Sequence, residues 1–235
     1  MNVVSLMAHQ DDEMHCLGTL IRCRARGDRL HFITLTDGTK GFVHRPDISS
    51  EEAGRIRDGE MCALAAELDA EYINLGEPDE FLYDTSEVRM KLIDAVRRTR
   101  ADLVFTHSEQ DYNLDHTTTS ALARHCIMQA SLPVLATETA PLEAHPAVFM
   151  VAPHGAFEFT PSHFVDISEC HAEKVRLLGH HCSQTEAMRQ VVGAAFEELC
   201  HRMDAYWGGQ AGCAFAEAFV PMSGRGTMKP FRTLP

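Results

Sequence analysis

The fold of this chain is decided near its N-terminus, by the stretch Val3-Val4-Ser5-Leu6-Met7-Ala8-His9-Gln10-Asp11-Asp12-Glu13. The segment 3–8 is a short apolar run, and such a run before a polar cluster is typical of a buried strand that leads into a loop. The segment 9–13 then places one histidine and three carboxylates at the end of that strand. Adjacent carboxylates repel one another, so a cation bound there would relieve an energetic penalty.

A helix start is the alternative interpretation of the segment 9–13, because acidic side chains complement the dipole at the beginning of a helix. A catalytic zinc site needs three protein ligands, commonly histidine or carboxylate, one open position and a base for the bound water. The segment supplies residues of all these types. Its spacing alone leaves both interpretations open.

Strand-like and helix-like segments alternate four times over residues 1–130. The expected strands span 3–8, 30–35, 71–75 and 103–106, and the expected helices span 13–26, 50–68, 86–100 and 117–130. This alternation predicts an α/β fold with a Rossmann-like, mostly parallel sheet flanked by helices. Ligands of such sheets bind beyond the carboxyl ends of the strands. We therefore expect the loops at 9–13, 36–41, 76–84 and 107–116 to lie on one rim.

The remainder of the chain, 131–235, is less regular. We expect short strands with long connections over 133–161, a strand end near 164–167, helices over 169–180 and 185–206, and a loop over 208–226. No obvious linker separates this part from residues 1–130. We therefore expect one domain over 1–235, in which the irregular C-terminal part completes the rim of the active site.

Composition and charge disfavour several classes of protein. Lys plus Arg number 21 and Asp plus Glu number 34, which gives a formal charge of −13. Such an acidic surface disfavours nucleic acid and anionic membranes as partners. No apolar run reaches the length of about 18 residues that a membrane span requires, and the N-terminus lacks the basic leader of a signal peptide. The eight cysteines form no Cys-x-x-Cys pair, which favours free thiols in the reducing cytoplasm.

A second cluster, Asp111-Tyr112-Asn113-Leu114-Asp115-His116, follows the fourth expected strand. It again combines carboxylates with a histidine just before a helix, and by itself it is also explained by a capped helix start. Both clusters are expected on the same rim of the sheet, which favours a metal site. A nucleotide-binding oxidoreductase is disfavoured, because no Gly-x-Gly-x-x-Gly follows the first strand and acids there would repel a pyrophosphate.

Residues 8–13 resemble the Ala-His-Pro-Asp-Asp-Glu signature of the PIG-L/LmbE-like N-deacetylases, and residues 113–116 are similar to the His-Pro-Asp-His motif of that family. Weaker similarities follow in the same order along the chain, at 36–38, 57–60, 181–184 and 216–219. The resemblance implies an LmbE-like fold. It also implies a hydrolase that uses zinc to remove acetyl groups from N-acetylglucosamine-type compounds.

The resemblance further assigns the metal and the general base. His9, Asp12 and His116 would bind Zn2+, although a site of this composition also accepts Fe2+. Asp11 would be the general base that takes a proton from the zinc-bound water. The two adjacent aspartates can divide these tasks, because a coordinated carboxylate is held ionised while its neighbour stays free to accept a proton.

Three further positions would support the site. Arg57 would contact the substrate, and the alternative is that it lies on a solvated helix face. Glu13 would support the loop or cap the following helix. Gln10 replaces the proline of the family signature. Because proline fixes the backbone but carries no chemistry, we expect this change to have a small effect on loop rigidity.

Asn113 is the main departure from the family pattern, because it replaces the first histidine of the His-Pro-Asp-His motif. We count Asn113 and Asp115 among the catalytic positions. The amide of Asn113 can donate a hydrogen bond to an oxyanion, a contact typically worth about 2.7–4 kcal/mol, but it cannot deliver a proton. Asp115, the expected partner of the replaced histidine, then has a smaller role in catalysis. Either Asp11 returns its own proton to the departing amine, or another group does so. The candidates for that group are His15, His107 and His154.

We therefore expect a zinc-dependent hydrolase that acts on an N-acetylated amino sugar or a sugar-like small molecule. One alternative is an amidase for another small acyl amide, such as a thiol conjugate. A second alternative is a metal- and ligand-binding protein with weak turnover, because Asn113 cannot deliver a proton. The resemblance also allows a homo-oligomer.

Overall fold

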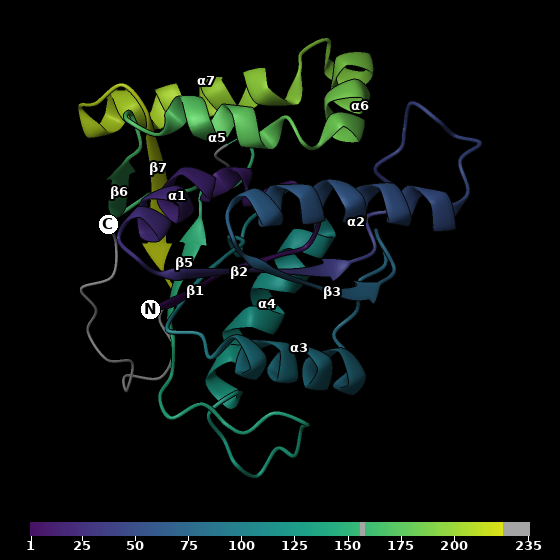
Figure 1. Ribbon diagram of the computed structural model, residues 1–235, viewed down its shortest axis with the longest axis vertical. Helices are drawn as coiled ribbons and strands as arrows, with labels where there is room; N and C mark the ends of the chain where they lie inside the picture. The colour runs from purple at the N-terminus through teal and green to yellow at the C-terminus, as the bar shows by residue number, and fades with distance from the viewer. Residues whose placement is uncertain (156–157, 223–235) are drawn as a thin grey trace.

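A seven-stranded sheet forms the centre of the molecule, in the order β3-β2-β1-β4-β5-β7-β6 (Figure 1). The computed structural model describes residues 1–155 and 158–222. The strands are β1 (Asn2–Met7), β2 (Arg29–Thr36), β3 (Glu71–Glu77), β4 (Leu103–Thr106), β5 (Ala147–Val151), β6 (His163–Asp166) and β7 (Ala216–Pro221). Strands β1 to β5 are parallel, and β7 is antiparallel to both of its neighbours. The mostly parallel sheet predicted from the sequence is confirmed.

Helices cover both faces of this sheet (Figure 1). One face carries α1 (Leu17–Ala25), α2 (Ser50–Glu67), α5 (His171–Leu178) and α7 (Phe196–Ala211), with α6 (Cys182–Val192) beside α7. The other face carries α3 (Ser86–Thr99) and α4 (Leu114–Gln129). Each layer encloses its own apolar core, which includes Leu20 and Leu64 on the first face and Val96 and Leu122 on the second. Fully burying one such side chain stabilises the fold by about 1.5–3 kcal/mol.

Side-chain caps fix the first residues of three helices. Ser49 caps α2, Thr85 caps α3 and Asn113 caps α4, and each accepts a hydrogen bond from a backbone N–H two or three residues ahead. Such caps satisfy donors that have no partner within the helix. Because Asn113 is a cap, α4 begins earlier than we expected, and Asp115 and His116 lie in its first turn rather than in a loop.

Three expectations for the C-terminal part are wrong. Among its described residues, the segment 133–161 contains one strand, β5, instead of several. The helix expected over 185–206 is interrupted between α6 and α7, where Gly193 adopts a left-handed φ of 71°. The loop expected over 208–226 contains the end of α7 and the strand β7, and its last part, 223–226, lies outside the described residues. The alanines of β7 have little intrinsic strand propensity, so its place between β5 and β6 depends on tertiary packing.

Arg97 explains why the chain after α4 does not form strands. Its buried guanidinium donates hydrogen bonds to the carbonyl oxygens of Ala130 at 2.9 Å, Leu132 at 2.7 Å and Leu135 at 2.8 Å. Buried backbone carbonyls need a partner, which strands obtain from a sheet. Here one side chain provides it, so the segment can turn across the end of α4 without a sheet.

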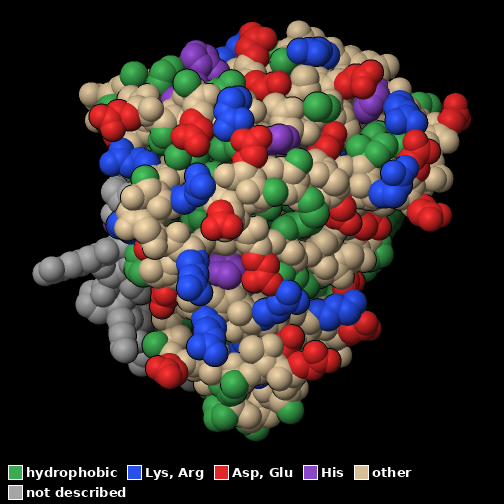
Figure 2. Space-filling model, in the orientation of Figure 1, with side chains coloured by type: hydrophobic (Ala, Val, Ile, Leu, Met, Phe, Trp, Pro, Cys, Tyr) green, Lys and Arg blue, Asp and Glu red, His purple; other side chains and the backbone are tan. Residues whose placement is uncertain are grey.

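The described surface carries mixed charge. Figure 2 shows acidic and basic side chains interspersed over the face in view, with no large patch of one sign. No helix in the described ranges is both long and apolar enough to cross a membrane. All eight cysteines are free, as we expected from their spacing.

A buried ion cluster joins the C-terminal part to the first helix. Lys174 donates to a carboxylate oxygen of Asp204 and of Glu217, both at 2.8 Å, and all three side chains are buried. Glu217 also accepts hydrogen bonds from the backbone N–H of Gly18 at 2.8 Å and of Thr19 at 2.7 Å. The cluster therefore fixes the start of α1, which directly follows the loop with the metal-site motif.

We predict that Lys174→Met destabilises the fold by about 3–5 kcal/mol, because it leaves two buried carboxylates without a cation. Urea denaturation followed by circular dichroism measures the free energy of unfolding. The matched control is Arg176→Met, which removes an exposed ion pair of the same helix with Glu67 and should change stability little. An equal effect of the two substitutions would show that the buried cluster does not hold the fold together.

Candidate metal and active site

Three side chains from distant parts of the chain meet beyond the end of β1. His9 follows β1, Asp12 begins a short 3-10 helix (η1, Asp12–His15), and His116 lies in the first turn of α4. His9 Nδ1 lies 3.2 Å from His116 Nε2 and 3.2 Å from Asp12 Oδ2, and His116 Nε2 lies 3.3 Å from Asp12 Oδ1. Ligand atoms about 2.0–2.1 Å from a tetrahedral zinc ion lie roughly 3.3 Å apart. The three residues predicted as metal ligands are therefore brought together, and their donor atoms fit such an ion.

Carboxylates lie close to the outer nitrogens of both histidines. His9 Nε2 lies 3.1 Å from Asp79 and 3.5 Å from Asp115, and His116 Nδ1 lies 3.1 Å from Asp111. A histidine that binds a metal commonly donates its other N–H to a carboxylate, which fixes the tautomer and the ring orientation. The arrangement leaves one nitrogen of each ring free to face the other two ligands.

We did not predict Asp79 and Asp111 as site residues. Asp79 ends the Gly-Glu-Pro-Asp turn after β3, and Asp111 is two residues ahead of the cap of α4. Their positions at the carboxyl ends of β3 and β4 were a usable signal, because histidine ligands need carboxylate partners and this rim is where they can be supplied.

The two adjacent aspartates of the motif face different surroundings. Burial raises the pKa of Asp12, but the His116 and His107 rings outweigh it and lower that pKa well below its usual range. Burial raises the pKa of Asp11, and the nearby Arg57 only partly opposes this. Environments that push the pKa values of two neighbouring acids apart are typical of pairs with different tasks. Asp12 therefore suits a permanently charged ligand, and Asp11 suits a group that accepts a proton.

The backbone conformation of Asp11 gives the two aspartates their different surroundings. Its φ is 128°, a conformation that residues other than glycine rarely adopt. The conformation is held by Arg57 Nη2, which donates to Asp11 Oδ1 at 3.1 Å and also to the backbone carbonyl of Gln10. The solvated helix face that we considered for Arg57 is wrong, because its side chain is 2% exposed. That Arg57 contacts a substrate stays a prediction.

Glu13 supports the loop from the other side. It accepts a hydrogen bond from the backbone N–H of Asp11 at 3.0 Å, and its second oxygen lies 2.6 Å from His181 Nε2. Glu13 and His181 are both buried. The similarity noted at 181–184 thus corresponds to a residue that pairs with the metal-site motif across the fold.

Gln10 has a larger role than we expected for a replacement of proline. Its side chain is fully buried, and its amide nitrogen lies 3.3 Å from Asp58 Oδ1, which also accepts from Tyr72 at 3.0 Å and Asn74 at 2.7 Å. A Cβ at Gly38 would lie 2.2 Å from the Gln10 amide oxygen, so only glycine fits there. A hydrogen bond to α2, which Asp58 in turn joins to β3, therefore holds the loop that proline would stiffen locally.

Asn113 and Asp115 organise the start of α4. Asn113 Oδ1 accepts the backbone N–H of Asp115 at 2.7 Å. The carboxylate of Asp115 accepts the backbone N–H groups of Glu80 at 2.8 Å and Leu82 at 3.1 Å. Asp115 therefore anchors the loop after β3 against α4, besides contacting His9. Asp79 Oδ2 accepts the backbone N–H of Lys40 at 2.7 Å, which brings the loop after β2 to the same rim.

Comparison with known proteins identifies a related family. The family described as "PIG-L: GlcNAc-PI de-N-acetylase" matches residues 4–127 of this chain. The match covers β1 to β4 and nearly all of α4, and therefore all the residues of the metal-site motif. No curated protein matches the sequence.

Solved structures share the fold over almost the whole chain. An N,N'-diacetylchitobiose deacetylase from Pyrococcus horikoshii is 21% identical with a TM-score of 0.81, covering 96% of this chain and 87% of that one. A 4-carboxy-2-hydroxymuconate hydratase from Pseudomonas putida is 21% identical with a TM-score of 0.82, covering 98% and 100%. A conserved protein from Thermus thermophilus is 29% identical with a TM-score of 0.78, covering 98% and 100%. These similarities confirm the LmbE-like fold, which carries more than one reaction.

We predict that the protein binds one divalent ion per chain and that His116→Gln abolishes this binding. Asp111→Asn should lower the affinity for zinc by about 10–100-fold, because it removes only the partner of a ligand. Elemental analysis and zinc titration of the purified variants measure both effects. The control is His125→Gln, an exposed histidine of the same helix. Full metal content in His116→Gln would refute the site.

We also predict that Gln10→Glu destabilises the fold by about 3–5 kcal/mol, since it places a buried carboxylate beside the half-buried carboxylate of Asp58. Gln110→Glu is the control, because it adds the same charge to an exposed position of the loop after β4. Urea denaturation measures the free energy of unfolding of both variants. Equal stabilities would mean that the network around Asp58 does not hold the loop.

Proposed function

We propose that this chain, which belongs to the PIG-L family, is a zinc-dependent hydrolase that removes an acetyl group from an N-acetylated amino sugar or a similar small molecule. The observation that carries the proposal is the separation of the two aspartates. Asp12 joins His9 and His116 in a set of donors that fits a metal, while Asp11 turns away from that set and is held by Arg57.

The residues of the site have complementary tasks in this reaction. A zinc ion held by His9, Asp12 and His116 would polarise the amide carbonyl and lower the pKa of a water molecule. Asp11 takes a proton from that water as it attacks the carbonyl carbon. Arg57 keeps the carboxylate of Asp11 in place through the bond to Oδ1.

Asn113 is our candidate for oxyanion stabilisation. Its amide oxygen caps α4, which fixes the side chain and leaves the amide N–H groups to donate elsewhere. One such donor lowers the barrier by about 2.7–4 kcal/mol when it faces the developing oxyanion. Asp115 acts as a positioning residue in this scheme, since its oxygens are occupied by backbone N–H groups and by His9.

An amidase for a larger or less polar acyl amide is the second candidate. Large apolar side chains are exposed on two of the loops that surround the metal ligands and at the start of α4. They are Phe81, Tyr83, Tyr112 and Leu114. Exposed apolar groups near a polar site favour binding of substrates with apolar parts. This observation supports a substrate with an aromatic or alkyl group next to the amide.

A substrate panel tests both candidates. The panel contains N-acetylated amino sugars, acetylated thiol conjugates and aryl acetamides, and acetate release is measured with and without a chelator. We include an unsaturated carboxylic acid, because a hydratase shares this fold. Chelator-sensitive acetate release that returns with added zinc is the expected result. Hydration of the unsaturated acid without hydrolysis of any amide would overturn the proposal.

For the amide that is hydrolysed best, we predict that Asp11→Asn lowers kcat by about 10²–10⁴-fold, the usual contribution of a general base. The metal content should be unchanged, because Asp11 is not among the three ligands. Asp84→Asn, at an exposed position of the loop after β3, is the control and should retain full activity. A fully active Asp11→Asn variant would remove Asp11 from the mechanism.

A further inference from the structure

The departing amine of an amide must gain a proton, and Asn113 cannot provide one. Resting on the proposed hydrolysis, we propose that His154 is the catalytic residue that protonates the leaving nitrogen. His154 lies in the loop after β5, the strand next to β4 in the sheet. It is half-buried, whereas the other described histidines near the metal ligands, His15, His107 and His181, are buried.

His107 is held in the wrong state for this task. Its Nε2 accepts the backbone N–H of Ala8 at 3.0 Å, and its ring stacks on His116 with centroids 4.0 Å apart. His107 is therefore a buried ring, 1% exposed, whose Nε2 is used by the backbone after β1.

His15 and His181 are also excluded by their surroundings. His15 is buried within η1, and burial lowers its pKa to about 3, so its ring is uncharged near neutral pH and is a poor acid. His181 is fully buried, and its Nε2 is bound to Glu13 at 2.6 Å. A proton taken from His181 would leave the Glu13 carboxylate buried without its partner.

Tyr112 places His154 next to the metal ligands. Its ring meets His116 edge-on with centroids 5.8 Å apart, and it meets His154 edge-on with centroids 6.3 Å apart. His154 and the metal ligand His116 thus both lie against the ring of Tyr112. The phenol itself is a poor acid near neutral pH, because a tyrosine hydroxyl ordinarily has a pKa of about 10.

The proton transfers balance as follows. Asp11 takes one proton from the attacking water, and the oxygen forms a bond to the carbonyl carbon. The carbon–nitrogen bond then breaks, its electron pair goes to nitrogen, and the protonated imidazole of His154 gives its proton to that nitrogen. The products are acetic acid and the free amine. Asp11 releases its proton to solvent and His154 takes one up, so both groups return to their initial states.

Leaving-group dependence gives the sharpest test. An N-acetylated alkyl amine needs a proton on nitrogen before it departs, whereas 4-nitroacetanilide releases a weakly basic amine that needs little help. We expect His154→Gln to lower kcat about 10²-fold or more on the alkyl amide, the usual contribution of a general acid. On 4-nitroacetanilide the loss should be less than threefold. His154→Ala should recover activity on the alkyl amide when imidazole is added.

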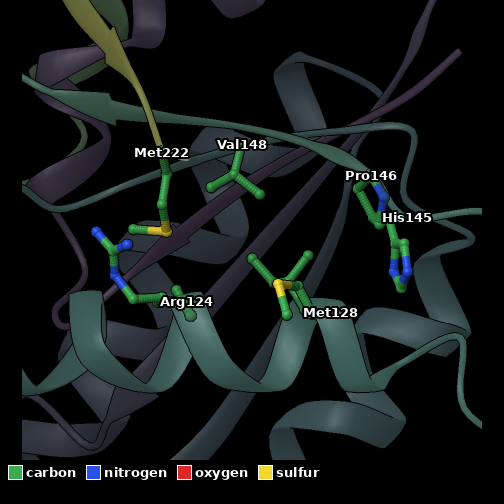
Figure 3. A pocket seen from close by; sticks show the side chains of 8 residues that line it. Arg124, Met128, His145, Pro146, Val148 and Met222 are labelled. Carbon is green, nitrogen blue, oxygen red and sulfur yellow. The ribbon is translucent and has the colours of Figure 1, made fainter. Parts of the chain in front are cut away.

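A matched control lies at the other end of the same strand. His145 precedes β5 and lines a small pocket beside α4. Figure 3 shows Met128 and Met222 among the other side chains that line this pocket. His145→Gln should leave the hydrolysis of both substrates unaffected.

Hydrolysis by the unmodified protein tests the proposed function itself. If that protein is active, an unimpaired His154→Gln, or an equal loss on both amides, overturns only the assignment of His154 and points to Asp11 as the source of the proton.

Discussion

Repulsion among three consecutive carboxylates is the constraint on which this site depends. Asp11, Asp12 and Glu13 lie together at the end of β1, and each turns toward a different positive or hydrogen-bonding partner. Arg57 from α2 pairs with Asp11, three imidazoles approach Asp12, and His181 from the segment between α5 and α6 pairs with Glu13. The unusual backbone of Asp11 is what spreads the three side chains apart. The motif therefore reaches its functional shape only when distant helices are packed around it.

The rim around the motif is held by carboxylates that bind backbone rather than other side chains. Asp115 accepts two N–H groups of the loop after β3, and Asp79 accepts one from the loop after β2. Both also approach His9 on the side away from the metal position. Loops without regular structure can in this way be as well defined as the strands that precede them. The same bonds orient the first histidine of the metal set.

The sequence predicts the parts that depend on local patterns. The apolar runs and helical spacing locate β1 to β4 and α1 to α4 within a few residues, and the similarity to a known family identifies His9, Asp12 and His116 as neighbours in space. Long-range effects were not predictable. Strand β7 is rich in alanine and is a strand because β5 and β6 flank it. The burial of Arg57 and the pairing of Asp79 with His9 depend on contacts between elements, which no local spacing reveals.

His9 and His116 are 107 residues apart in the chain, yet their ring nitrogens lie 3.2 Å from each other. An unfolded chain has no such pair, so an ion held between them would bind the folded state alone. Binding and folding are then thermodynamically linked, and a free ion concentration of 1,000 times Kd would add about 4.1 kcal/mol to the stability. The supply of metal would set how long the protein survives in the cell, as well as whether its active site is complete.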